Sequence, residues 1–199
     1  MKNEVQTESE ISREDWLNRA AESMRSYLFA PIGETLPPVR VSVGFTGARQ
    51  SESLKVLGAC WKPDAASDGV SQIFIMPTLD NGLRVLDVLA HECIHAIKPN
   101  AGHGSEFKRI ALKIGLEGPM RATVAGPELR ARLEKLVEVL GPYPHAKLNL
   151  NDRKKQGTRM LKVECKDCAY ICRVTRSQLQ RLGTPICPGC KVNMRCDEL

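Results

Sequence analysis

The chain has 199 residues, of which 42% are hydrophobic and 26% are charged. Such a composition is normal for a globular protein, and this length allows one ordinary domain and a small appendage without disulfides. The first twelve residues are polar, and no segment approaches the roughly 18 apolar residues of a membrane span. We therefore expect a cytoplasmic protein with no secretory signal and no membrane partner.

Charge and cysteine are both concentrated near the C-terminus. Residues 1–144 contain 17 Lys and Arg against 18 Asp and Glu, whereas residues 145–199 contain 12 against 5. Six of the eight cysteines lie from Cys165 onward. The basic excess indicates a contact with nucleic acid or another polyanion, or else a solvated basic surface. In a reducing compartment, clustered cysteines indicate a metal site rather than disulfides.

The first predicted element is an amphipathic helix that starts after Ser12 and ends before Pro31. Asp15, three positions after Ser12, is typical of a helix N-terminus, and apolar residues then recur at helical spacing. The next apolar runs predict three strands of a small antiparallel sheet, over residues 39–45, 55–61 and 71–77. Three further helices are predicted over residues 83–97, 105–114 and 128–140, with a loop over residues 117–126.

The helix over residues 83–97 carries His91, Glu92 and His95 in the H-E-x-x-H arrangement. Residues four positions apart lie on the same face of a helix, so both imidazoles can bind one metal ion. A zinc ion held in this way lowers the pKa of a bound water to about 7, and Glu92 can accept the proton as general base. The alternative is a pair of surface histidines on an amphipathic helix.

A catalytic zinc ion needs a third protein ligand, and His103 follows His95 by eight residues, after a turn that contains Pro, Asn and Gly. Glu106 is an alternative ligand, or it orients one of the ligands without itself binding the zinc ion. His145 or Tyr143 could donate to the carbonyl oxygen of a substrate, although a turn at the edge of the domain is the simpler interpretation. The third histidine favours a metal site over coincidence.

Two C-x2-C pairs separated by 18 residues have the spacing of a four-cysteine zinc ribbon. Its predicted ligands are Cys165, Cys168, Cys187 and Cys190. Four thiolates leave no open coordination position, so this zinc is expected to be structural, with Cys172 and Cys196 as spare cysteines. The candidates for electrostatic contact with a phosphate backbone are Arg153, Lys154, Lys155, Arg159, Lys162, Arg173 and Arg176.

These motifs resemble the SprT-like zinc metallopeptidase family, which includes the Spartan-type DNA-dependent proteases. The similarity rests on VLDVLAHECIHAI, GHGSEFKRIALKIGL, the strands with GACW and IFIMP, and the cysteine ribbon, and it covers residues 15–195. The stretch LEGPMRATVAGPELRARL resembles a subgroup associated with phages and actinobacteria. The resemblance implies zinc ligands at His91, His95 and His103, with Glu92 as general base.

The resemblance also implies an α+β fold, in which a minimal zincin-like domain with a small antiparallel sheet precedes a zinc ribbon. The expected division is a disordered N-terminus (1–12), a SprT-like zincin domain (13–147), a basic linker (148–160) and the ribbon (161–199). The implied function is a zinc-dependent endopeptidase, in a bacterial or phage-infected cytoplasm, that acts on proteins bound or crosslinked to DNA. We expect a monomer with two zinc ions that binds DNA as single strands or without sequence specificity.

Two other functions stay open at the level of the sequence. One is a zinc-ribbon factor that binds nucleic acid or takes part in transcription, with a structural or vestigial histidine site. The intact Glu92 argues against it, because a purely structural site has no use for a base beside an open position. The other is a zinc hydrolase of non-peptide bonds, such as an amidase.

Overall fold

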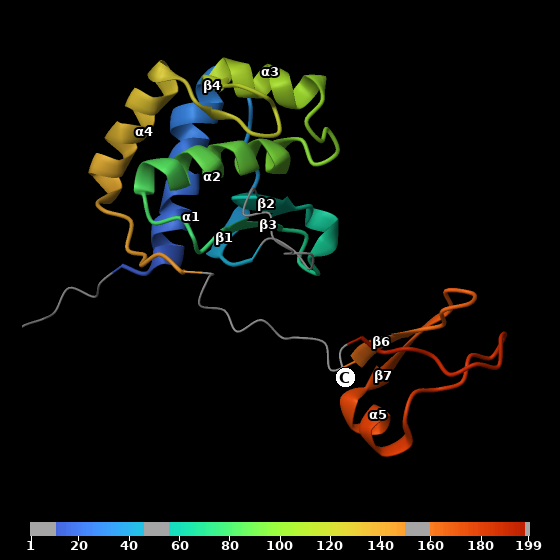
Figure 1. Cartoon of the computed structure of the whole chain (residues 1–199). Coiled ribbons are helices and arrows are strands. Elements are labelled where there is room, and N and C mark those ends of the chain that lie inside the picture. The colour runs from blue at the N-terminus through green and yellow to red at the C-terminus, as the bar shows by residue number, and fades with distance from the viewer. Residues whose placement is uncertain (1–10, 46–55, 150–159, 198–199) are drawn as a thin grey trace, which may run out of the picture. The chain divides into compact units, whose positions relative to one another are not determined.

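The computed structural model describes residues 11–45, 56–149 and 160–197, and the chain divides into two compact units, residues 1–150 and 151–199 (Figure 1). The fold is mixed α+β, as the sequence predicts, and each unit has a hydrophobic core of its own. The division falls within the predicted basic linker, most of which lies outside the described residues. Among the described helices, none is long and apolar enough to cross a membrane.

Helix α1 (Arg13–Met24) begins where the sequence predicts. Ser12 caps it, because its hydroxyl accepts a hydrogen bond from the backbone N–H of Asp15. Ile11 packs against the core, so the folded unit begins before the predicted boundary at residue 13, while residues 1–10 lie outside the described part. After α1 the chain continues in a π-helical turn and a 3-10 turn, over Arg25–Phe29 and Ala30–Ile32.

The three predicted strands form one sheet with the order β1-β3-β2. Their bounds are β1 (Val39–Val43), β2 (Gly58–Trp61) and β3 (Ser71–Ile75). Strand β2 is antiparallel to β3, but β1 is parallel to β3, so the predicted antiparallel sheet is wrong and the sheet is mixed. Alternating apolar residues identify a strand and its buried face, but they contain no information on which neighbour the strand pairs with, or in which direction.

Helix α2 (Gly82–Ile97) crosses one face of this sheet, with α1 and α4 beside it and α3 on the side away from the sheet (Figure 1). Helices α3 (Ser105–Ile114) and α4 (Pro127–Leu140) confirm the predicted ranges to within one residue. Trp16, Phe29 and Phe107 are the largest fully buried side chains of the core. Burial of this apolar surface is the main stabilising contribution to the unit.

A short hairpin lies where the sequence predicts a loop. Strands β4 (Leu116–Glu117) and β5 (Val124–Ala125) pair antiparallel, with Leu116 opposite Ala125. Two residues are too few for an alternating pattern, which is why the sequence does not reveal these strands. The hairpin holds the turn between them beside α2.

The second unit is an antiparallel pair, β6 (Met160–Glu164) and β7 (Ile171–Thr175), followed by helix α5 (Arg176–Leu182). Thr175 caps α5 by accepting a hydrogen bond from the backbone N–H of Gln178. The apolar core of the second unit has few buried residues, namely Leu161, Val163, Cys165, Leu179, Cys187 and Met194. A core of this size does not stabilise so short a segment without a further crosslink.

Two glycines that end helices in the left-handed region offer a matched test of the packing. Gly33 (φ 79°) has open space where a Cβ would lie, whereas a Cβ on Gly115 (φ 94°) would meet the Cβ of Leu129 at 3.1 Å. Gly33→Ala should lower the free energy of unfolding by about 1 kcal/mol, from backbone strain alone. Gly115→Ala should lower it by about 2 to 3 kcal/mol, because the core must also shift. Denaturant unfolding measures both, and equal losses would contradict the packing described.

Candidate metal centres

The three clustered histidines converge from two elements. His91 and His95 lie one turn apart on α2, whose N-terminus is capped by the side chain of Asn81. His103 lies in the turn between α2 and α3. Its Nε2 atom is 3.2 Å from Nε2 of His91 and 3.3 Å from Nε2 of His95. The predicted trio is therefore brought together by the fold.

These distances fit a bound metal ion. Zinc–nitrogen bonds of about 2.05 Å in a tetrahedron place neighbouring nitrogens about 3.3 Å apart. Hydrogen bonds alone do not account for the cluster, because one neutral imidazole carries a single N–H and cannot donate fully to two others. The three residues are compatible with zinc, and three ligands leave a fourth coordination position open.

The environment keeps these imidazoles neutral, which is the form that binds metal. Burial, and then repulsion from His95 and His103, lowers the pKa of His91 to about 3. Burial and His103 likewise lower the pKa of His95 to about 4. The pKa of His103, the most exposed of the three, is lowered by burial and by the nearby Arg121.

Two residues that sequence reasoning missed support the cluster. Nδ1 of His91 lies 2.7 Å from the hydroxyl of Thr123, in the turn between β4 and β5. When Nδ1 carries the proton and donates it to this hydroxyl, the Nε2 lone pair faces the other histidines. The ring of Phe107 lies 4.7 to 5.0 Å from all three imidazole centroids and forms an apolar floor. Phe107 belongs to the segment GHGSEFKRIALKIGL, whereas no local pattern identifies Thr123.

Glu92 projects into the same site from α2 and is buried, with 6% of its surface exposed. Burial raises its pKa to about 8, although a hydrogen bond from the backbone of Cys60 acts in the opposite direction. Gly58 makes the position possible: a Cβ there would lie 2.7 Å from Val88 and 2.9 Å from Glu92. The GACW segment is thus constrained by the close approach of β2 to α2.

The histidines and Glu92 line one cavity of about 480 Å³, with β2 as one wall. Arg84, Arg121 and Lys62 also line it. Arg84 is held by an ion pair with the buried Asp87, one turn before His91 on α2. Asp87 also accepts a hydrogen bond from the backbone of Ala125 and so connects α2 to the hairpin that carries Thr123.

His145 and Tyr143 are not part of this cavity. The ring of Tyr143 packs on Trp16 at 4.9 Å and lies beside Gly82, nine residues or about 13 Å along α2 from His91. Nε2 of His145 lies 2.9 Å from the carbonyl oxygen of Pro77. The structure thus gives both residues contacts at the edge of the unit and brings neither to the histidines.

Other predicted candidates also lie apart from the cavity. Glu106 is exposed in the first turn of α3 and does not belong to the group of ligand atoms. Cys93, which lies between the two histidines of α2, is fully buried in the core. Cys172 and Cys196 pack against the small core of the second unit and are not among its converging cysteines.

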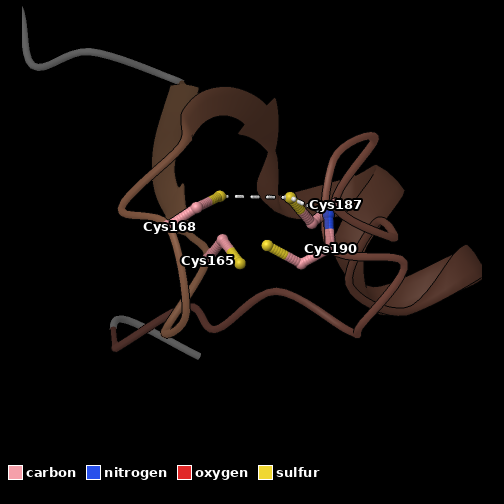
Figure 2. Close-up of side chains that lie close together, drawn as sticks. All are labelled: Cys165, Cys168, Cys187 and Cys190. Carbon is pink, nitrogen blue, oxygen red and sulfur yellow. Dashed lines mark hydrogen bonds between the residues drawn. The ribbon is translucent and has the colours of Figure 1, made fainter.

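Four cysteines converge in the second unit, and their sulfur atoms point toward one centre (Figure 2). Ligand atoms of Cys165, Cys168, Cys187 and Cys190 all lie within 4.8 Å of one another, and Sγ of Cys168 is 3.6 Å from Sγ of Cys187. Zinc–sulfur bonds of about 2.3 Å give tetrahedral sulfur separations of about 3.8 Å. The cluster is compatible with a closed zinc site, and the unit could be a zinc ribbon.

The two C-x2-C segments share one backbone conformation. The N–H of Ala169 donates to the carbonyl of Cys165, and the N–H of Lys191 donates to that of Cys187. Both Ala169 (φ 57°) and Lys191 (φ 59°) are left-handed, which is uncommon for residues with a Cβ. The repeated turn explains how each pair directs two thiols to one point.

The predicted phosphate-contacting cations are only partly covered by the structure. Arg153, Lys154, Lys155 and Arg159 lie outside the described residues. Lys162 on β6 lies opposite Arg173 on β7, and Arg176 begins α5; all three are exposed. Lys162 pairs with Glu164 at 2.5 Å, so part of its charge is already compensated.

Compared with known proteins, the chain matches no family model, no curated protein and no solved structure.

The two clusters predict a metal content of two zinc ions per chain. His95→Ala should lower it to one, because two imidazoles do not retain the ion, and Cys187→Ser should remove the other. His145→Ala, which changes the one histidine outside the cluster, should keep two. Elemental analysis after gel filtration measures this content. An unchanged value for His95→Ala would exclude the histidine site.

Thr123 offers a test of how the first histidine is held. Thr123→Val removes the hydroxyl while nearly preserving shape, and it should weaken zinc binding at the histidine site about 10- to 100-fold. Thr123→Ser retains the hydroxyl and should bind zinc as the parent does. Chelator competition measures both affinities, and equal affinities for Val and Ser would show that the contact does not orient His91.

Proposed function

We propose that the chain is a zinc-dependent endopeptidase of the SprT-like type that acts on proteins bound or crosslinked to DNA. The observation that carries this proposal is the convergence of three neutral imidazoles and one buried carboxylate on a single open cavity. A structural metal site needs neither the open position nor the carboxylate.

The residues divide the chemistry among them. Zinc bound by the three imidazoles would act as a Lewis acid toward water and the substrate carbonyl. Glu92 in its ionised form would accept a proton from the attacking water, and burial, which raises its pKa to about 8, favours the protonated form that then delivers the proton to the leaving amine. Gly58 and the backbone of Cys60 hold Glu92 against β2, and Phe107 excludes water from behind the imidazoles.

Strand β2 supports a peptide as the substrate. Among the described strands it lies at an edge of the sheet, and its residues 58–60 line the cavity together with Val56 and Leu57, which precede it. The carbonyl of Leu57 accepts a hydrogen bond from the N–H of Met76, so the alternation of an antiparallel ladder turns the backbone groups of Gly58 and Cys60 away from β3. The N–H of Cys60 donates to Glu92, which leaves both backbone groups of Gly58 and the carbonyl of Cys60 for a peptide. An extended peptide could pair with this edge and bring a backbone carbonyl to the histidines.

The basic C-terminal unit supports a DNA-associated role. Residues 145–199 carry 12 cationic against 5 acidic residues, and Arg173 and Arg176 are exposed. Tyr170 is the aromatic residue exposed beside the cysteine cluster, which offers little for base stacking. We therefore expect salt-dependent binding through phosphates, with weak sequence preference.

A cleavage assay with and without single-stranded DNA tests this function. Glu92→Gln should keep both zinc ions yet lose at least about a hundredfold in the rate of cleavage of a DNA-bound protein, because the general base is gone. Glu106→Gln makes the same change at an exposed position on α3 and should cleave as the parent does. Cleavage by zinc-loaded Glu92→Gln at the parental rate would overturn the mechanism, and DNA binding without any cleavage by the parent would leave only a binding function.

A further inference from the structure

The side chains that line the histidine cavity are more basic than the first unit as a whole. Residues 1–144 contain 17 Lys and Arg and 18 Asp and Glu and are nearly neutral as a whole. The described residues that line the cavity nevertheless include Lys62, Arg84 and Arg121, against Glu92 as the sole acid among them. A cavity whose walls focus one sign of charge favours ligands of the opposite sign.

Two of these cations, Arg84 and Arg121, differ in how firmly they are held, and a binding site can use both a fixed and a free cation. Arg84 is fixed, because its guanidinium pairs with Asp87, whose side chain is 8% exposed. Arg121 lies in the turn between β4 and β5, two residues from Thr123, and no ion pair involves it in the described part of the chain. Its guanidinium is exposed and free to form a bidentate contact with a carboxylate.

We infer that Arg84 and Arg121 form an anion-binding subsite beside the histidine cluster, which selects peptides with a carboxylate close to the scissile bond. The position next to a scissile bond rests on the proposed function, whereas the anion-binding subsite itself rests on the residues that line the cavity. The carboxylate comes from an Asp or Glu side chain or from the C-terminus of the peptide. Lys62 contributes less, because its Nζ already donates to Asn100 at 2.8 Å.

A phosphate of nucleic acid is the competing ligand. The cavity favours a peptide, because one of its walls is an edge strand that can pair with an extended backbone, whereas the described lining offers no aromatic side chain on which a base could stack apart from the clustered imidazoles. The experiment therefore includes an oligonucleotide arm.

Binding is measured first, because it does not depend on turnover. Zinc-loaded Glu92→Gln is titrated, by fluorescence anisotropy, with peptides that differ only in a single Glu, Gln or Lys moved along the sequence. At its preferred position, the Glu peptide should bind about tenfold more tightly than the Gln peptide, as a charge-assisted bidentate contact provides. Amidation of the C-terminus distinguishes the two sources. If the terminal carboxylate is the ligand, amidation should weaken binding about tenfold and the Glu and Gln peptides should bind equally, whereas a side-chain ligand gives the Glu preference and no effect of amidation.

Charge reversal then identifies the residue responsible. Arg121→Glu should lose the preference for Glu and bind the Lys peptide better, whereas Lys113→Glu, with the same charge change on the exposed end of α3, should behave as the parent does. A Glu preference that survives Arg121→Glu would overturn the inference, since the carboxylate would then bind the metal directly. Equal affinities for Glu and Gln peptides together with no effect of C-terminal amidation, or a loss limited to oligonucleotide affinity, would also overturn it.

Cleavage by the parent separates this inference from the proposed function. Peptide selectivity in binding with no cleavage of any peptide or DNA-bound protein would keep the subsite and reject the endopeptidase. Cleavage that is indifferent to Glu, Gln and Lys and to C-terminal amidation would keep the endopeptidase and reject the subsite.

Discussion

Helix α2 is the element on which the rest of the first unit depends, because it is mostly buried and also carries two histidines of a candidate metal site. Ten of its sixteen residues are buried, so packing surrounds most of its circumference. What stays accessible is a narrow strip that carries His91 and His95. An amphipathic surface helix would leave a wider and more mobile polar face. Here the surrounding core restricts both rings to positions compatible with one metal ion.

The burial of Glu92 shows that the site is not arranged for stability. A carboxylate with no cationic partner among the described contacts is expensive to bury, and its raised pKa expresses that cost. A side chain at position 58 would take the space of Glu92, because any residue other than glycine would bring a Cβ within 3 Å of it. Unfavourable burial of this kind persists where the surrounding structure fixes it, as it does at functional sites.

The local parts of the candidate site could be predicted from the sequence, and its non-local parts could not. Helical periodicity places His91 and His95 on one face, and a short turn limits where His103 can lie. Thr123 reaches His91 across 32 positions through a hairpin of two-residue strands, which leave no periodic signal. The parallel pairing of β1 with β3 is likewise a property of the whole fold and not of either strand.

His145 shows the converse case, a residue that the sequence suggested for the site and that the fold places elsewhere. Its residue type suited a donor to the substrate, but the chain after Gly141 is held elsewhere: the indole of Trp16 donates to the carbonyl of Gly141 at 3.1 Å. Tyr143 then packs on Trp16, and His145 meets Pro77. Residue type alone does not fix the direction of a segment once a helix has ended.

The two metal sites differ in what the ion would contribute. In the second unit the described apolar core is small, and four thiols from two equivalent turns converge on one point. An ion bound there would have no open coordination position and would contribute folding energy. In the first unit a large core already fixes the histidines, and an ion would contribute chemistry instead. On the proposed function, removal of metal should therefore have different consequences in the two units: loss of structure in the second, and loss of the proposed activity within an intact fold in the first.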